Sequence, residues 1–234
     1  MNTLGLAIFG ISAVISAVVG IRLLWVASRS RELPELTIGL VMLLELVSAA
    51  LWAAASSSAT GQLVSTVAAA GSASSMAVFV RYTFAPDSWS GRIGLAALLL
   101  TSAACVLLPT RAGAWGSADF YLQFGWLASL ARAAAYAWAS LAAGRSRATL
   151  RRRARLGLSH PLSASRVGFW CIASGMACAS FSIPLIEILT QTVRPLGISP
   201  ISMVLAIAAA GSTWLAFYPP RVYVTWALSR AEQA

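Results

Sequence analysis

The chain has 234 residues, of which 59% are hydrophobic and only 10% are charged, and its formal net charge is +10. Because a typical globular domain is about a quarter charged, too few polar side chains remain here to cover a surface that faces water. The composition therefore excludes an ordinary soluble domain and predicts a single-domain integral membrane protein of the all-α class.

Seven apolar stretches have about the length, roughly 20 residues, that a helix needs to cross the hydrocarbon core. The first stretch continues to Arg22 without a cleavage motif, so we expect a retained helix rather than a signal peptide. Pro34, Pro109 and the pair Pro219–Pro220 are expected to mark helix ends, since proline interrupts helical hydrogen bonding. The predicted spans of the seven-helix bundle are residues 4–27, 36–56, 62–83, 93–108, 120–143, 167–190 and 198–218.

Arginine alternates between the connections of these spans. The first, third and fifth connections and the tail, with their edges, hold fourteen Arg, whereas the second, fourth and sixth hold two. The positive-inside rule then predicts that the N-terminus lies outside and the C-terminus in the cytoplasm. The expected location is the inner (plasma) membrane of the cell. Tryptophans near the predicted inner boundary are expected to anchor the helices there; they are Trp25, Trp89, Trp170 and Trp226.

Small residues recur every four positions on the first predicted span, at Ser12, Ser16 and Gly20. Such a stripe lets two helix backbones approach closely. It predicts close packing inside the bundle or a face for a homo-oligomer, and the pattern leaves both open.

Two ionisable residues lie deep inside predicted spans. Counting 1.5 Å per residue, Glu45 lies about 15 Å and Arg132 about 12 Å from the inner edge of the hydrocarbon core. Charge at this depth is costly, so it faces the bundle and commonly pairs. We expect a Glu45–Arg132 ion pair that is structural or belongs to a ligand or proton site; separate partners are the alternative.

A second polar group lies towards the predicted outer side. Pro184 bends the sixth span and frees a backbone carbonyl, and Glu187 follows it by three residues. Together with further residues at the outer ends of the spans it forms either an outward-facing ligand pocket or ordinary interfacial polarity. The further candidate ligand-binding residues are Gln191, Asp119 and Gln123, with Tyr121 and Gln62 nearby.

Residues 144–166 form the most basic segment, and no acidic residue interrupts it. A nucleic-acid site needs a folded module to present base-reading groups, and we expect room here only for a short extension and a turn. The segment is therefore predicted to contact anionic headgroups at the inner face, with a cytoplasmic protein partner as an addition. The predicted lipid contacts are Arg145, Arg147, Arg151, Arg152, Arg153 and Arg155.

The residues or motifs that several classes of chemistry require are absent from the sequence. The chain has no Lys, which excludes a retinal Schiff base. The single histidine, His160, has no Cys or carboxylate at ligand spacing, so no metal site is expected. The three cysteines lie in apolar runs and predict no disulfide framework. Without a recognisable catalytic motif, neither an enzyme nor a cofactor is expected.

Several short motifs lie at the predicted cytoplasmic face, among them residues 31–36 (RELPEL), residues 156–161 (LGLSHP) and residues 217–220 (FYPP). With them the chain resembles uncharacterised bacterial seven-transmembrane-helix proteins, and its Pro-Pro ending is similar to the seven-helix sensory regions of bacterial signalling proteins. The resemblance implies the seven-helix fold and carries no site residue.

These observations favour a receptor-like or regulatory membrane protein. We expect it to bind a small or lipidic ligand from the outer side and to act on a cytoplasmic partner through helix movement around Pro184. A small-solute transporter is the first alternative and predicts a water-filled path joining Glu45, Arg132 and Glu187. The second alternative is a membrane-embedded lipid-modifying enzyme.

Overall fold

A computed structural model describes residues 3–158, 161–190 and 200–225 of the chain. All regular structure in this part is helical and no strand occurs in it, which confirms the all-α class. The elements are α1 (Thr3–Ser30), α2 (Leu33–Ala55), α3 (Ala59–Phe84), α4 (Trp89–Ala112), the π-helical turn η1 (Tyr121–Gly125), α5 (Trp126–Arg155), α6 (Pro161–Leu189) and α7 (Pro200–Phe217).

Five of these helices are long and apolar enough to cross a membrane, so the chain is a multi-pass membrane protein. Their membrane-crossing parts are Gly10–Ser30, Leu33–Ala55, Ala59–Phe84, Trp89–Ala112 and Leu162–Leu189. The described apolar part of α7, Val204–Phe217, is shorter, and α5 carries Arg132 and the arginines that follow Gly144.

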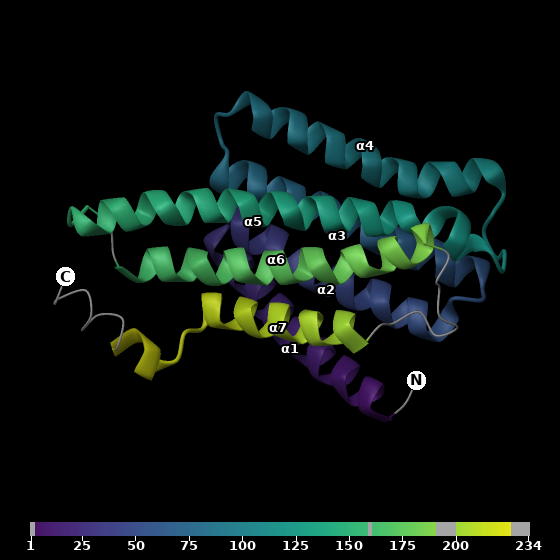
Figure 1. Cartoon of the computed structure of the whole chain (residues 1–234), viewed down its shortest axis with the longest axis horizontal. Helices are drawn as coiled ribbons and strands as arrows, with labels where there is room; N and C mark the ends of the chain where they lie inside the picture. Colours follow the sequence, from purple (N-terminus) through teal and green to yellow (C-terminus); the bar gives the residue numbers. More distant parts are fainter. Residues whose placement is uncertain (1–2, 159–160, 191–199, 226–234) are drawn as a thin grey trace.

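Six helices form a closed ring, and α4 lies outside it (Figure 1). Around the ring α1 packs on α2, α2 on α3, α3 on α5, α5 on α6, α6 on α7, and α7 back on α1. α4 packs on α3, α5 and η1. α1 begins at one end of the bundle and the chain leaves α7 at the other (Figure 1). This arrangement surrounds an interior to which six helices contribute side chains.

The crossing of α1 and α2 depends on two glycines that face each other. A Cβ added to Gly20 would lie 3.2 Å from the carbonyl oxygen of Gly39, and one added to Gly39 would lie 3.1 Å from that of Gly20. At this point the small-residue stripe packs inside the bundle. Ser12 and Ser16 of the same stripe face the interior cavity instead.

An aromatic cluster fills the ring at the arginine-rich end. Trp170 of α6 packs against Phe79 of α3 and Phe217 of α7, with ring centroids 5.3 and 5.4 Å apart. Trp170 is only 8% exposed, so its predicted role as an interfacial anchor is wrong, because its ring fills the space between three helices. Trp25 and Trp89 are exposed, and Trp226 lies outside the described residues.

The predicted basic loop is mostly helix. α5 continues through Arg155, about 16 Å beyond Gly144, and projects past the ends of the neighbouring helices (Figure 1). A left-handed Gly157 (φ +69°) then ends the helix, with Leu158 N–H donating to Arg153 O at 2.9 Å and Gly157 N–H to Ala154 O at 3.0 Å. Good helix formers such as Arg and Ala at residues 145–155 favour this extension over a loop.

Candidate ligand cavity

A cavity of about 310 Å³ lies inside the ring and is lined by all six ring helices. No residue of α4 lines it. Its walls combine hydroxyl groups with aromatic rings, a mixture typical of ligand pockets, which are mainly apolar with a few polar groups. The lining includes Ser12 and Ser16 of α1, Trp52 of α2, Ser65 of α3, Phe181 of α6 and Ser202 of α7.

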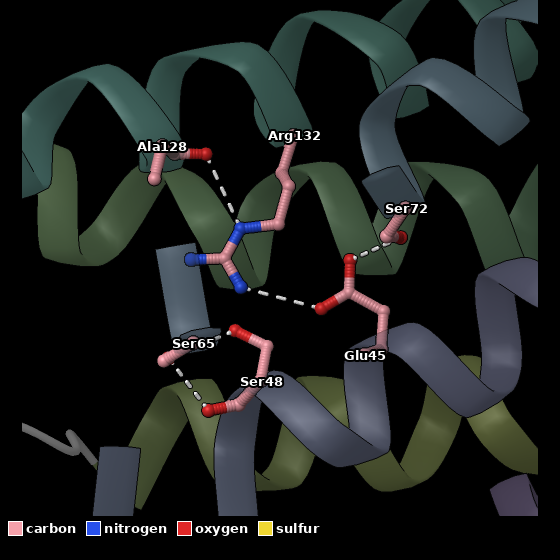
Figure 2. A network of polar contacts seen from close by, with 6 residues as sticks. All are labelled: Glu45, Ser48, Ser65, Ser72, Ala128 and Arg132. Atoms are coloured by element: carbon pink, nitrogen blue, oxygen red, sulfur yellow. Dashed lines mark hydrogen bonds and ion pairs between the residues drawn. The ribbon is translucent and has the colours of Figure 1, made fainter. Parts of the chain in front are cut away.

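The ion pair predicted from depth is present at the wall of this cavity (Figure 2). A terminal guanidinium nitrogen of Arg132 lies 3.2 Å from Oε2 of Glu45. Ser72 of α3 donates its hydroxyl to the other carboxylate oxygen, Oε1, at 2.7 Å. The Arg132 Nε–H donates to the carbonyl of Ala128 at 3.2 Å. Both carboxylate oxygens of Glu45 are therefore engaged by neighbouring helices.

The pair is neither fully buried nor open. The side chains of Arg132 and Glu45 are 18% and 19% exposed, and both line the cavity. The guanidinium carbon of Arg132 also lies 4.5 Å from the ring centroid of Phe181 on α6, a cation–π contact. A molecule in the cavity can thus touch a charged group that is already held in place by three helices.

Serine pairs fix the neighbouring helices around the cavity. The Ser65 hydroxyl on α3 donates to Ser48 O of α2 at 2.8 Å, and the two side-chain oxygens lie 3.3 Å apart (Figure 2). Ser180 of α6 donates to Ser202 O of α7 at 3.1 Å. These bonds satisfy polar atoms that would otherwise face apolar surroundings.

One end of the cavity is shaped by η1, which the sequence pattern does not reveal. Tyr121 of η1 packs on Trp52 of α2, with centroids 5.2 Å apart. A Cβ on Gly125 would lie 2.6 Å from the Tyr121 ring, so this tight turn requires glycine. Tyr121, Phe124 and Gly125 all line the cavity. π-helical turns of this kind are frequent at functional sites.

The other residues of the predicted outer pocket lie elsewhere. Asp119 and Gln123 are exposed and Glu187 is half-buried, and none of the three lines the cavity. Gln191 lies outside the described residues. Of the group predicted near the outer ends, only Tyr121 lines the cavity.

Gln62 holds two loops together instead of facing the cavity. It is 3% exposed, and its amide nitrogen donates to Ser56 O at 2.9 Å and Ser117 O at 3.1 Å. Its amide oxygen accepts from Gly116 N–H at 2.8 Å. Gln62 therefore joins the α2–α3 turn to the segment before η1.

A second, smaller cavity of about 110 Å³ lies beside the first. The two share lining residues, including Glu45, Ser12 and Phe181. Trp170 and Thr213 line the smaller cavity, so it extends from Glu45 towards the aromatic cluster. Ser174, which is 1% exposed, lines it with a hydroxyl that has no partner among the described residues.

No three His, Cys, Asp or Glu side chains come together as metal ligands in the described part of the chain. His160 lies outside that part. The three cysteines, Cys105, Cys171 and Cys178, are free.

Comparisons with family models, with curated proteins and with solved structures each gave no match. The resemblance to seven-helix sensory regions therefore stays a prediction, and the functional argument rests on the geometry of the cavity.

Proposed function

We propose that the chain is a receptor-like or regulatory protein with seven spans, its N-terminus outside and its C-terminus in the cytoplasm, which binds a small ligand in the ring cavity. α5 packs between α3 and α6, and α7 between α6 and α1. All three of these neighbours belong to the five long apolar helices, so we infer that α5 and α7 also lie in the membrane. The arginine-rich end then faces the cytoplasm, and η1, which lines the larger cavity, precedes α5 at the end away from the arginines.

The observation that carries the proposal is the Glu45–Arg132 pair on the wall of a cavity. Ionisable side chains inside a membrane are costly and commonly mark functional sites. A pair that served packing alone would be covered on all sides, whereas this one keeps about a fifth of each side chain exposed. The exposure favours a role in binding.

The signal is proposed to travel along α6. Phe181 and Pro184 line the cavity on this helix, and a proline inside a helix removes one backbone hydrogen bond and weakens the helix against bending. At its other end α6 begins at Pro161, and the projecting end of α5 precedes it in the sequence. A ligand that displaces Phe181 would tilt α6 and move the basic segment. A cytoplasmic partner bound to this segment would detect the movement.

The basic segment is proposed to contact anionic headgroups as well. Arg145, Arg151, Arg152 and Arg153 are exposed, and juxtamembrane arginines are attracted to the negative inner surface. Leu156 and Leu158 at the tip are each 72% exposed, which adds an apolar surface for a protein partner.

The test begins with a thermal-shift screen of small amphiphiles on the protein in lipid nanodiscs. Ligand binding to the folded state raises the melting temperature, and Ala128→Phe, which fills the cavity, is expected to abolish that rise. Ala96→Phe on the exposed face of α4 is the matched control. Spin labels at Thr149 and Ser165, in a background without the native cysteines, then report the α5–α6 spacing. An unchanged spacing with a bound ligand would count against the signalling role.

The second cavity favours a small-solute transporter as a second candidate function. It is lined by both Glu45 and Trp170, and in the proposed orientation Trp170 lies on the cytoplasmic side, so transport would require the aromatic cluster to part. Uptake of a screened ligand into proteoliposomes distinguishes the two functions, because a receptor binds the ligand without accumulating it inside. No feature of the described residues favours the lipid-modifying enzyme.

A further inference from the structure

Arg132 retains an unused hydrogen-bond donor at the ion pair. Of its three guanidinium nitrogens, one donates to Glu45 and Nε donates to Ala128. The second terminal nitrogen, Nη2, points away from Glu45 and has no partner among the described residues (Figure 2). Each oxygen of Glu45 already accepts one of the two hydrogen bonds open to it. The site therefore offers a donor to a ligand, and the complementary ligand group is an oxygen acceptor.

A carboxylate is the acceptor that best matches a guanidinium, because the two form parallel hydrogen bonds. Binding an anion here would leave two carboxylates beside one cation in a site of low dielectric constant. Two carboxylates that share a site do not both stay ionised. Charge balance then requires one proton for each anion bound.

Glu45 can accept that proton without losing its neighbour. A serine hydroxyl has one donor and two acceptor lone pairs, so Ser72 can donate to the ionised Glu45 and accept from the protonated one. Three titratable groups interact electrostatically with Arg132 of this pair: Tyr121 of η1, Tyr136 of α5 and Cys105 of α4. Glu187 of α6 also interacts electrostatically with Tyr121, and Glu45 interacts in the same way with Tyr136.

We propose that the ligand is a small monocarboxylic acid with an apolar body, whose carboxylate takes the place of Glu45 on Arg132 while Glu45 takes up one proton. This inference rests on the proposed ligand-binding function and names its ligand class. The step balances: one carboxylate anion and one proton enter, and the site stays neutral. No covalent bond forms or breaks except the new O–H bond of Glu45.

The walls of the cavity define the rest of the ligand. Phe120, Phe124 and Trp52 line it together with the hydroxyl groups, and rings of this kind bury an apolar chain or ring. A volume of about 310 Å³ is at the low end for ligand pockets. It suits a short-chain or aromatic acid and is too small for a phospholipid.

The smaller cavity offers a route for the proton. Its volume of about 110 Å³ holds several water molecules, since one water needs roughly 10–15 Å³ of such space. The unpartnered Ser174 hydroxyl gives these waters a hydrogen-bonding group, and Glu45 lines the same cavity. Water in this cavity would connect Glu45 to the Ser174 and Thr213 hydroxyl groups.

Calorimetry of the full chain in neutral nanodiscs tests the proposal with octanoate and its neutral analogue octanamide. Between about pH 6 and 8, octanoate is ionised. Because its binding takes up one proton, its affinity should fall about tenfold for each unit by which the pH rises. Titrations in buffers of different ionisation enthalpy should give an uptake of about one proton. Octanamide should bind with neither pH dependence nor proton uptake.

Glu45→Gln should bind octanoate more tightly, with no proton uptake and no pH dependence, because Arg132 then lacks a competing anion. Glu45→Gln with Arg132→Gln keeps the site neutral and should lose octanoate while it retains octanamide, which also reports that the bundle is folded. Octanoate binding without proton uptake would overturn the proposal. Binding of octanamide or octylamine but not octanoate would also overturn it, yet leave the ligand-binding function standing. Failure of every amphiphile in the screen would instead overturn the proposed function.

Discussion

Glu45 and Arg132 form an ion pair between two helices that are not neighbours in the ring, because α3 lies between α2 and α5. Ser72 of that intervening helix completes the contact. Three helices are thus tied by one polar cluster across the interior, and the stability of the bundle and the chemistry of the cavity depend on the same atoms.

Loss of one partner of the pair should destabilise the bundle. We expect Arg132→Gln or Glu45→Gln to cost about 3 kcal/mol, the lower end for a buried pair, since both side chains are partly exposed. The double substitution should cost less than the sum, with a coupling energy of about 1–3 kcal/mol. Reversible unfolding in detergent measures all three variants. Additivity of the two single effects would show that the pair contributes nothing as a pair.

A side chain at the α1–α2 crossing should separate the two helices. Gly39→Val places methyl groups against the Gly20 carbonyl and Leu24, where even a Cβ would lie 3.1 and 2.8 Å away, and we expect a loss of about 1–3 kcal/mol. Gly211→Ala is the control, because a Cβ there has no neighbour within 4 Å. It should be neutral or stabilising by up to about 1 kcal/mol. Equal melting temperatures of the two variants would contradict the observed crossing.

Removal of the Gln62 amide should loosen the segment before η1. Gln62→Leu keeps the size of the side chain but leaves Gly116 N–H and two carbonyl oxygens without this partner, for a loss of about 1–3 kcal/mol. Hydrogen exchange at Gly116 should become faster. The exposed Gln123 provides the matched control, and Gln123→Leu should leave this exchange unchanged.

Neutral residues at the tip of the basic segment should weaken lipid contact without unfolding the bundle. Arg151, Arg152 and Arg153 are exposed and belong to the last turns of α5, so their joint replacement by Gln should reduce the number of phosphatidylglycerol molecules retained in native mass spectrometry. High salt should have a similar effect on the unaltered protein. A triple Lys variant keeps the charge and should retain the lipid, while unfolding of the Gln variant would mean that the segment is packed.

Arg81 offers a contrast to these three residues. Its guanidinium donates to the carbonyls of Ala85 and Pro86 after the end of α3, so Arg81→Gln should destabilise the α3–α4 turn. A melting temperature that falls for Arg81→Gln but not for the tip variant would separate the structural arginines from the solvated ones.

The sequence predicted features that depend on length and depth. Apolar stretches predict long helices, and the rise per residue brings Glu45 and Arg132 to one level, where they do pair. It could not predict which face of a helix turns inward, since nearly every face is apolar. The spacing of Ser12 and Ser16 therefore indicates a packing stripe, although both residues line the cavity in the structure.

Local hydrogen bonding accounts for the remaining differences. The π-helical turn at Tyr121 requires Gly125, but a single glycine in a sequence does not by itself predict such a turn. The inward position of Gln62 depends on Ser117, which is 55 residues away along the chain. A polar residue at the start of a span looks interfacial until its distant partners are known.

The position of α4 outside the ring has a consequence for the path of the chain. α3 and α5 are ring neighbours that run in the same direction, so a connecting segment must carry the chain back to the starting side, as the crossover helix does between two parallel strands. α4 is that return segment. Because it lines neither cavity, another apolar helix of similar length could replace it and preserve the chemistry inside the ring, provided that it kept a buried face against α3 and α5.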